Sequence, residues 1–473
     1  MKRVAIIGGG ISGLSAAFVL EQQRRAGALL EYVVFESSSR FGGVLFTEHV
    51  DGYLIEAGPD SFLTEKPGAS ELCHQLGLGD QLIGSNDSSR KTYILVKNRL
   101  VVLPNGLMFM LPTKILPALA SPLFSASTKW KIAGEWFHPR FEAAADESVA
   151  SFLERHYNPE MVERLADPLL SGVYGGEASQ LSVRAVLPRF AEMEATHGSL
   201  GRAMLSARKR ASQVPEQPAK PLFTSLQNGM QQMVDALLAH LPTAAMRPNT
   251  QVASMQPRAG EWLLSTSHGS EPFDAVIVAA TARSAAALMN GGETADLAQE
   301  LSQINYSSSV TVTLGYDQSV RSSLPAGFGF LVPRSEGKRM LAATFVHNKF
   351  PHRAPENRAL IRCFLGGTRD ESALRLSDEE ILRIVRGELQ QILGLTAEPL
   401  FTRVYKWKAA MAQYNVGHLD RLDRIELLRK RHPGLALAGN GYRGIGVPDC
   451  VRSGKEAADQ ALAAVGLAKQ AAS

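Results

Sequence analysis

Cysteine is scarce in this chain, and so is an excess of charge of either sign. Cys73, Cys363 and Cys450 lie far apart in 473 residues, which argues against a disulfide framework or a cysteine metal site. Fifty Lys and Arg residues face 46 Asp and Glu residues, so the chain lacks the one-sided basic surface of a nucleic-acid-binding protein. We expect a globular, cytoplasmic protein of a reducing compartment that binds no nucleic acid.

Long apolar runs are missing as well. The run from Val4 to Ile7 stops at three glycines, which makes it too short for a secretory leader. The most apolar window, Leu107 to Ala126, is interrupted by Lys114 and three prolines, whereas a membrane-spanning helix needs about 20 apolar residues in a row. We therefore expect no transmembrane helix. A peripheral membrane contact and a homodimer stay open.

Segments typical of a nucleotide-binding sheet occur at the start, in the middle and at the end of the chain. Residues 3–7 and 31–36 are predicted strands on either side of a helix at 12–23. Apolar runs at 273–279 and 435–438 predict two further buried strands. The simplest arrangement is one dinucleotide domain built from discontinuous segments, with other domains inserted between them.

The inserted segments differ in their periodicity. Residues 104–201 read as helical, with one helix at 161–170 that should end at Ser171-Gly172, and 214–220 reads as a linker. Residues 52–61 are predicted to return to the first sheet. Further predicted elements are strands at 309–316, 329–333, 340–346 and 359–365, a helix over 378–393 with a capping box of Ser377 and Glu380, and a last helix from Cys450.

The first glycine cluster, Gly8 to Gly13, lies directly between a predicted strand and a predicted helix. Gly8 permits a tight turn, Gly10 lets a pyrophosphate approach the backbone, and Gly13 lets helix and strand pack closely. The helix N-terminus then faces the phosphate charge. Glu36 ends the next strand 23 residues after Gly13, where a carboxylate accepts hydrogen bonds from an adenosine ribose. The alternative is a tight turn in an ordinary α/β sheet.

An arginine and two glycines follow this carboxylate. Arg40 is placed to neutralise cofactor charge, and Gly42 and Gly43 allow close backbone approach. A solvated surface arginine is the alternative. Together with the first cluster, the pattern resembles the glutathione-reductase-like group of FAD proteins that includes the amine oxidases.

A third glycine cluster, Gly439 to Asp449, follows a predicted buried strand and opens the final helix. A helix start aimed at the pyrimidine edge of a flavin stabilises the negative charge that develops there on reduction. A glycine-rich surface loop is the alternative reading.

Four further blocks make the resemblance specific. The segments Glu56 to Leu63, Pro168 to Gly176, Trp407 to His418 and Gly446 to Cys450 resemble the FAD-dependent porphyrinogen oxidases of haem synthesis, nearly end to end. The block Gly58-Pro-Asp-Ser-Phe-Leu in particular is similar to the soluble, Bacillus-type branch of protoporphyrinogen and coproporphyrinogen III oxidases.

This resemblance implies an α/β fold with α+β insertions. A discontinuous Rossmann-like FAD-binding domain of glutathione-reductase or amine-oxidase type would carry a mixed-sheet substrate domain and an inserted helical domain. The expected boundaries are 1–80, 221–290 and 430–473 for FAD binding, 81–103 and 291–429 for substrate, and 104–213 for the helical, membrane-association-like domain.

The resemblance also implies an activity. The protein would use non-covalent FAD, molecular oxygen and a porphyrinogen substrate. It would oxidise coproporphyrinogen III to coproporphyrin III in haem biosynthesis. The oxidation would proceed by hydride transfer to the flavin and release hydrogen peroxide. Protoporphyrinogen IX oxidation on the same scaffold is the alternative. Another amine-oxidase-like FAD enzyme and a non-catalytic binder of the same fold are further alternatives.

Site residues follow from the resemblance position by position. Cofactor contacts are implied for Gly8, Gly9, Gly10, Ile11, Ser12, Gly13, Glu36, Ser37, Arg40, Gly43, Val44, Gly58, Pro59, Asp60, Ser61, Val252, Trp407, Ile445, Gly446 and Val447. Lys66 matches a lysine expected to meet a substrate carboxylate, although a solvated surface lysine is as good a reading. No constellation marks a general base or a metal site, and His418 reads better as structural. We therefore predict no catalytic side chain and no metal ligand.

Overall fold

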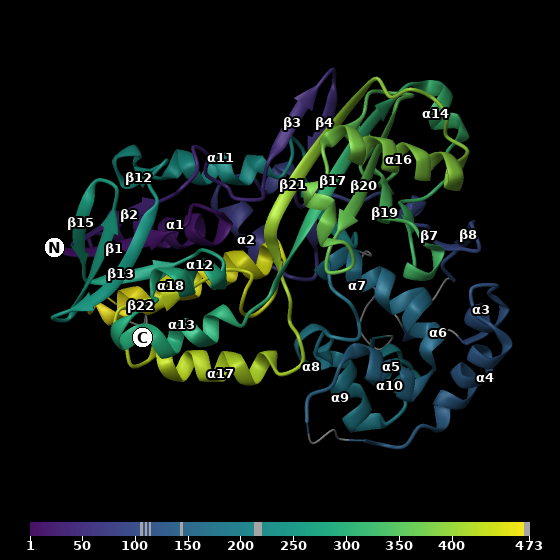
Figure 1. Cartoon of the computed structure of the whole chain (residues 1–473), viewed down its shortest axis with the longest axis horizontal. Coiled ribbons are helices and arrows are strands. Elements are labelled where there is room, and N and C mark those ends of the chain that lie inside the picture. The colour runs from purple at the N-terminus through teal and green to yellow at the C-terminus, as the bar shows by residue number, and fades with distance from the viewer. Residues whose placement is uncertain (105–106, 109–110, 113–114, 142–144, 212–219, 468–473) are drawn as a thin grey trace.

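The computed structural model of the chain describes residues 1–104, 107–108, 111–112, 115–141, 145–211 and 220–467. Figure 1 shows three regions: a parallel sheet with its covering helices on the left, a mixed sheet at the upper right, and a group of helices at the lower right. The two sheets combine segments that are distant in sequence, whereas the helices of the third region follow one another from α3 to α10.

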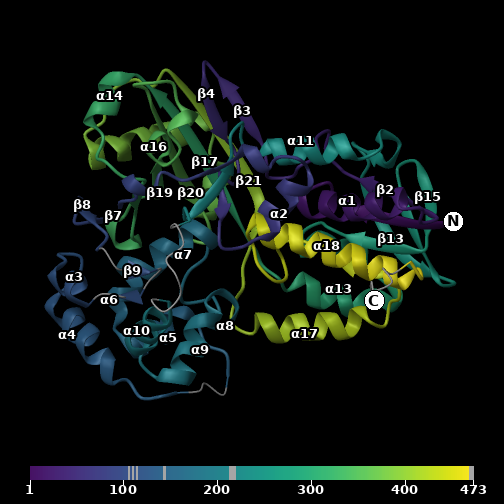
Figure 2. The ribbon, with the colours of Figure 1, turned by 180° about the vertical axis from the view of Figure 1, so that it is seen from behind.

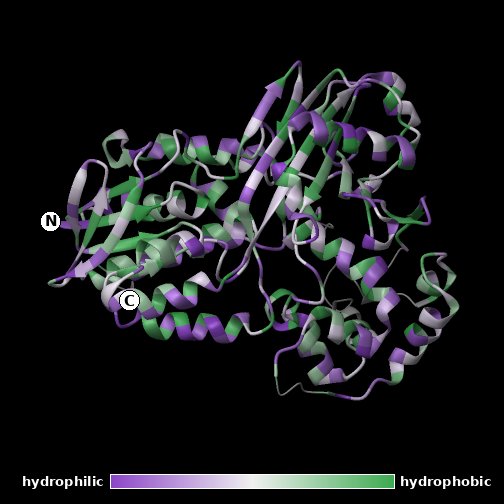
Figure 3. Cartoon of the chain, in the orientation of Figure 1, coloured by the Kyte–Doolittle hydropathy of each residue, from purple (hydrophilic) through white to green (hydrophobic). Residues whose placement is uncertain are grey.

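The parallel sheet has five strands in the order β12-β2-β1-β16-β22. Their bounds are Lys2–Ile7 for β1, Leu30–Phe35 for β2, Met246–Arg247 for β12, Ala275–Val278 for β16 and Leu435–Leu437 for β22. Ile7 lies between Phe35 and Val278 in register, so the carboxyl ends of three strands meet at one edge. Hydrophobic colouring runs along these strands in Figure 3. The sequence prediction of one sheet from distant segments is confirmed.

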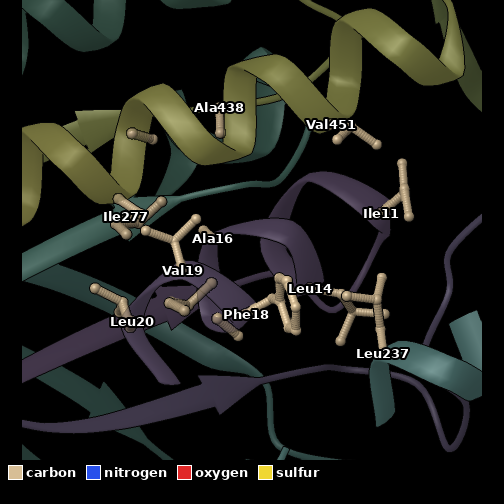
Figure 4. Close-up of a cluster of buried hydrophobic side chains, with 14 of the residues drawn as sticks. Ile11, Leu14, Ala16, Phe18, Val19, Leu20, Leu237, Ile277, Ala438 and Val451 are labelled. Atoms are coloured by element: carbon tan, nitrogen blue, oxygen red, sulfur yellow. The ribbon is translucent and has the colours of Figure 1, made fainter. Parts of the chain in front are cut away.

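Alternate side chains of β1 enter two different cores. Val4 and Ile6 pack with α1 (Ile11–Arg25), α11 (Gln231–His240) and α18 (Val447–Ala464), in the core that Figure 4 shows in part. Ala5 and Ile7 enter the core on the opposite face. That face is covered by β13 (Val252–Arg258), β14 (Glu261–Thr266), β15 (Gly269–Phe273), α12 (Ala282–Leu288), α13 (Ala295–Ser302) and α17 (His418–Arg429). Because strand side chains alternate with period two, burial on both faces produces an unbroken apolar run.

The mixed sheet has seven strands in the order β21-β17-β20-β19-β18-β7-β8. Its strands are β7 (Thr92–Val96), β8 (Arg99–Val102), β17 (Tyr306–Tyr316), β18 (Gly329–Leu331), β19 (Met340–Phe345), β20 (Ala359–Gly366) and β21 (Phe401–Ala412). Helix α16 (Asp378–Leu393) buries Ile381, Val385 and Leu389 against it, at helical spacing. The predicted capping box of Ser377 and Glu380 is present at the start of this helix.

The helical region is a set of short helices with a core of its own. Its helices are α3 (Ile115–Ala120), α4 (Ala126–Gly134), α5 (Val149–His156), α6 (Pro159–Met161), α7 (Asp167–Tyr174), α8 (Val183–Val186), α9 (Pro188–His197) and α10 (Leu200–Ala211). This core includes Ile94 of the mixed sheet, and α7 contacts β18 and β19. The helical region is therefore docked on the mixed sheet.

Short elements connect the three regions. They include β3 (Thr47–Val50), β4 (Tyr53–Glu56), β5 (Phe62–Leu63), α2 (Gly68–Gln75), β6 (Leu82–Gly84), β9 (Leu107–Met108), β10 (Leu111–Pro112), β11 (Phe223–Leu226), α14 (Gln318–Ser323) and α15 (Val346–Lys349).

Several local predictions were wrong. Residues 52–61 do not return to the parallel sheet, because Asp51 and Gly52 both have positive φ and form a hairpin turn that pairs β4 with β3. Helix α7 does not stop at Ser171-Gly172 but runs to Tyr174, where Gly175 takes the left-handed conformation. The 104–201 stretch also contains the antiparallel pair of strands β9 and β10, and β21 and α17 were not predicted.

The other outcomes are mixed. The α/β fold class is confirmed, and the predicted linker, apart from Lys220, lies outside the described residues. The three cysteines are buried free thiols. Among the described helices, none is long and apolar enough to cross a bilayer. The three-domain boundaries stay a prediction.

Candidate functional site

The first glycine turn lies at the carboxyl edge of the parallel sheet, between β1 and α1. Gly8 has a φ of +111° and donates its N–H to the Phe35 carbonyl at 2.8 Å. A Cβ on Gly13 would stand 1.9 Å from the Gly8 carbonyl oxygen, so only glycine fits there. Gly10 offers no side chain to cap α1, and no acidic residue occupies the first helical turn. An uncapped helix start of this kind suits a pyrophosphate.

Glu36 is oriented by the turn itself. One carboxylate oxygen accepts the Gly9 N–H at 2.8 Å, and the other accepts the N–H and Oγ–H of Ser38, each at 2.8 Å. Thr250 donates its N–H to the Glu36 carbonyl at 2.8 Å. This hydrogen bond holds the start of β13, at Val252, close to Glu36. Ser37 is exposed beside them. These residues lie together where the adenosine half of FAD is predicted.

The contacts of Arg40 are to the backbone of its own loop. Its guanidinium donates to the carbonyls of Phe41 at 3.1 Å, Leu45 at 2.9 Å and Gly43. The adjoining Gly42 donates its N–H to the Gly9 carbonyl at 2.8 Å. Arg40 thus holds the loop that touches the glycine turn, and its contact with a cofactor stays a prediction.

The loop from Gly58 to Ser61 lies between β4 and β5, against the Arg40 loop. A Cβ on Gly58 would stand 1.9 Å from the Val44 carbonyl oxygen, so the two loops are in backbone contact. Trp407 of β21 donates its Nε1–H to the Ala57 carbonyl at 2.9 Å. The structure therefore brings together three of the four segments on which the flavin contacts were predicted.

A buried ion cluster supports this loop, and the sequence analysis did not predict it. Its members are Glu56, Asp60, Lys349, Arg353 and Arg362. Lys349 Nζ donates to both carboxylate oxygens of Asp60 at 3.0 Å, and Arg353 Nη2 lies 3.1 Å from Glu56 Oε1. Arg362 donates to the Gly58 carbonyl and, at 3.3 Å, to the Ala57 carbonyl. With every group ionised, three cations outnumber two carboxylates.

Charge and burial act in opposite directions on the two carboxyl groups. Burial acts to raise the pKa of Asp60, but Lys349, Arg362 and Arg353 outweigh it and hold this pKa well below its usual range. At Glu56, burial raises the pKa in spite of the nearby Arg353. One sequence signal was available: Arg362 is a charged residue within the apolar run of β20, and such a residue is buried only when it is paired.

The last glycine turn reaches the same edge of the parallel sheet. It follows β22, which pairs with β16, and Gly446 is the N-cap of α18. A Cβ on Gly454 of α18 would stand 2.1 Å from the Ser12 carbonyl oxygen of α1. Figure 2 shows α18 and α1 side by side. Ile445, Gly446 and Val447 therefore share an edge of the sheet with the first glycine turn.

Two aromatic residues hold this last turn in place. The Tyr414 hydroxyl accepts the Gly444 N–H at 2.9 Å and donates to the Asn440 carbonyl at 2.8 Å. His418 stacks on Tyr414 with ring centroids 4.1 Å apart and donates Nε2–H to the Tyr442 carbonyl at 2.9 Å. Burial lowers the pKa of His418. These contacts agree with the structural role expected for His418.

Lys66 is tied to the same turn. Its Nζ lies 2.7 Å from Asp449 Oδ2 in the first turn of α18, and 43% of its side chain is exposed. The same Asp449 oxygen accepts the Gly446 N–H at 3.3 Å. Lys66 is therefore a partly exposed cation at the rim of the glycine turns, and its substrate contact stays a prediction.

The assembled residues fit a flavin dinucleotide. Two helices with glycine at the N-cap, Gly10 for α1 and Gly446 for α18, start at one edge of one sheet. A Cβ on Gly43 would stand 3.2 Å from Gly10 Cα, so the backbones approach closely there. Backbone N–H groups of this kind bind phosphate and stabilise negative charge. The site can therefore hold a dinucleotide and support redox chemistry on it.

Comparison with known proteins agrees with this geometry. The model of the family of flavin-containing amine oxidoreductases matches residues 11–462. A protein named coproporphyrinogen III oxidase from Bacillus subtilis (strain 168) is 35% identical to this chain, with 98% of each chain covered. One of the same name from Staphylococcus aureus is 30% identical, covering 98% of this chain and 99% of the relative. The chain belongs to the family of flavin-containing amine oxidoreductases.

Solved structures extend the comparison. A crystal structure described as a protoporphyrinogen oxidase from Exiguobacterium sp. 255-15 has a TM-score of 0.86 and 30% identity, covering 97% of this chain and 98% of that one. Reduced UDP-galactopyranose mutase has a TM-score of 0.71 at 15% identity, covering 99% of this chain and 97% of that one, which shows the shared fold alone.

Proposed function

We propose that this protein is an oxygen-dependent coproporphyrinogen III oxidase. It converts coproporphyrinogen III to coproporphyrin III in haem biosynthesis, uses non-covalently bound FAD and releases hydrogen peroxide. One observation carries the proposal: the first and last glycine turns share one sheet edge, in a chain that matches relatives of this name over nearly its whole length. Buried free thiols are consistent with a reducing, cytoplasmic setting.

Each part of the cofactor is assigned to part of the chain. The glycines and helix start from Gly8 to Gly13 hold the pyrophosphate, while Glu36, Ser37 and Val252 hold the adenosine. The flavin is enclosed by Gly43, Val44, the loop from Gly58 to Ser61, Trp407 and the segment from Ile445 to Val447. Arg40 supports this enclosure through its own loop.

The chain itself orients and polarises the site. Bound FAD supplies the two-electron redox chemistry, with molecular oxygen as the final acceptor. The start of α18 presents backbone N–H groups from Val447 onward, and their partial positive charge favours an anion at the pyrimidine edge. The ion cluster of Lys349, Arg353 and Arg362 fixes the loop from Gly58 to Ser61 from the other side.

The substrate is assigned to the boundary where the helical region meets the mixed sheet, beside the last glycine turn. In support, α7 contacts β18 and β19, and the Tyr174 ring centroid lies 6.1 Å from that of Tyr414. The proposed division is 1–80, 221–290 and 430–473 for FAD, 81–103 and 291–429 for substrate, and 104–213 for the helical domain.

A side-by-side turnover assay tests the function. We expect the purified yellow protein to oxidise coproporphyrinogen III in air, with porphyrin fluorescence and peroxide rising together, and to release free flavin when it is denatured. A preference for protoporphyrinogen IX would favour the second candidate, which the Arabidopsis thaliana relative named protoporphyrinogen oxidase 2, 28% identical, supports. Turnover of an amine alone, or a colourless protein, would contradict the proposal.

We predict that Lys66→Met raises the KM for coproporphyrinogen III about tenfold and leaves kcat unchanged. A charge-assisted hydrogen bond to a substrate carboxylate contributes roughly 1.5–3 kcal/mol, and binding lost equally from ground and transition states appears in KM alone. Lys430→Met, at the exposed residue that directly follows α17, is the matched control and should change neither constant. A lower kcat at constant KM would instead place Lys66 in support of Asp449.

We also infer a peripheral membrane contact through α4 and the turn after it. Trp130 is 80% exposed between Lys129 and Lys131, and Phe137 is 82% exposed. Aromatic rings beside lysines are typical of a membrane interface. Sedimentation with phosphatidylserine vesicles should fall for the double substitution Trp130→Ala and Phe137→Ala, but not for Leu427→Ala on α17. Equal sedimentation of all three proteins would contradict the contact.

A homodimer stays a prediction, which analytical ultracentrifugation checks.

A further inference from the structure

Two histidines and a glutamate meet within the helical region, away from the glycine turns. His138 follows the turn after α4, His156 ends α5, and Glu194 belongs to α9. One ligand atom from each lies within 4.8 Å of the others. His156 lies 18 positions after His138 and 38 positions before Glu194, and neither separation matches a known metal-binding motif. For this reason the sequence analysis predicted no metal ligand.

Hydrogen bonds orient both imidazoles. His138 Nδ1 lies 2.9 Å from the Pro139 carbonyl oxygen, which can only accept, so this nitrogen carries a proton. His156 Nδ1 lies 3.1 Å from Glu135 Oε1 and donates to it in the same way. In neutral rings the lone pair is therefore on Nε2 in both residues. A carboxylate or carbonyl behind Nδ1 is the usual outer partner of a metal-binding histidine.

The outer partners are themselves fixed. Glu135 accepts hydrogen bonds from the Ser199 hydroxyl at 2.9 Å and from the N–H groups of Leu200 at 2.6 Å and Gly201 at 3.1 Å. His138 stacks on His156 with ring centroids 4.0 Å apart.

The charge balance of the cluster leaves room for a cation. Glu135, Glu147 and Glu194 supply three negative charges, and Arg155, which pairs with Glu147 and Glu194, supplies one positive charge. With both imidazoles neutral the cluster carries a net charge of −2. Glu135 and Glu194 are 5% and 3% exposed, and buried carboxylates are costly unless counter-charges neutralise them. A divalent cation supplies that counter-charge in full.

We propose that His138, His156 and Glu194 bind one divalent transition metal of the Zn²⁺ type, which fixes the turn after α4 to α5 and α9. Imidazole and carboxylate ligands suit Zn²⁺, and three protein ligands leave a fourth position for water. With bonds of about 2.0–2.1 Å, ligand atoms of a tetrahedral site lie about 3.3 Å apart. Rotation of the half-buried His138 can close the remaining gap.

The competing reading of the same contacts is a cluster without metal. His156 Nε2 lies 2.9 Å from Glu194 Oε1, so a proton there makes His156 an imidazolium held between two carboxylates. The two readings differ in one measurable way, because a metal replaces that proton and recruits His138, whereas the imidazolium needs no second histidine.

Metal uptake by the flavin-loaded protein separates the two readings. After treatment with EDTA and equilibrium dialysis against micromolar ZnCl₂, elemental analysis should find one zinc per chain for the natural protein. His138→Ala should weaken zinc binding at least tenfold, and Glu135→Gln should weaken it 10- to 100-fold as an outer-partner substitution. His268→Ala, an exposed histidine between β14 and β15, is the matched control and should bind zinc fully.

A second readout guards against misfolding. Co²⁺ should give a visible absorption band with the natural protein that His138→Ala lacks, while both proteins retain the same flavin content and circular dichroism. No zinc uptake by the natural protein, or equal uptake by the natural protein and His138→Ala, would overturn the proposal in favour of the metal-free cluster. The result is independent of porphyrinogen turnover.

Discussion

Gly13→Ala should abolish flavin binding while leaving most of the chain foldable. A methyl group at this position would stand 1.9 Å from the Gly8 carbonyl oxygen and 3.3 Å from the Ala279 side chain. Helix α1 must then move away from β1, which widens the turn that is assigned to the pyrophosphate. Overpacking of this kind costs about 1–3 kcal/mol of unfolding free energy. We expect at least a tenfold loss of bound flavin, measured as flavin absorbance per mole of purified protein.

The matched control is the same substitution in another helix. Gly387 lies in α16 with no atom within 4 Å of an added Cβ, so Gly387→Ala should raise the unfolding free energy by about 0.5–1 kcal/mol and retain all of the flavin. A Gly13→Ala protein with full flavin content would show that α1 does not close on the cofactor. That result would remove the main support for the proposed site.

Lys349→Met should lower the stability of the folded protein substantially. The substitution leaves the Asp60 carboxylate, whose side chain is 16% exposed, without the ammonium group that contacts both of its oxygens at 3.0 Å. Removing one partner of a buried ion pair lowers the unfolding free energy by about 3–5 kcal/mol. Because Arg353 and Arg362 remain near Asp60, we expect a loss close to about 3 kcal/mol. Denaturant unfolding at neutral pH measures the difference.

The pH dependence of this loss identifies its cause. The pKa of Asp60 is lowered in the folded protein relative to about 3.9 in the unfolded chain, so the ionised carboxylate contributes stability above about pH 4 and loses that contribution as the pH falls further. The gap in unfolding free energy between the natural protein and Lys349→Met should therefore be full at neutral pH and shrink below pH 4. A gap of constant size across this range would contradict an origin in Asp60.

A surface lysine provides the comparison for this prediction. Lys406 lies 2.9 Å from Asp378, with 32% and 62% of the two side chains exposed. Exposed ion pairs contribute about 0–1 kcal/mol, so Lys406→Met should change the unfolding free energy by less than about 1 kcal/mol. The comparison separates the effect of burial from the loss of a charge.

The nucleotide-type elements were predictable because local physics specifies them. Strand β1 is apolar on both faces and stops at a glycine turn, and α16 begins at a capping box within its own sequence. The connections were less predictable. The hairpin at Asp51-Gly52 and the end of α7 at Gly175 each depend on which glycine takes a positive φ, and neighbouring glycines offered equally good candidates.

The polar clusters were not predictable for a different reason. The ion cluster at Asp60 joins β4, α15 and β20, and the histidine cluster at Glu194 joins three separate helical segments. A charged residue in an apolar strand, such as Arg362, signals only that a partner exists. It does not say which of the 46 acidic residues or many carbonyl groups supplies that partner.

The sequence by itself determined the fold class, the two glycine turns and the family. Glycine spacing and strand periodicity are local patterns, so they can be recognised without knowing which segments pack together. Tertiary structure alone decided that Lys66 faces Asp449, that Arg40 binds its own loop, and that His138 meets His156. These pairings depend on how distant segments approach one another, and burial then sets the strength of each charge interaction.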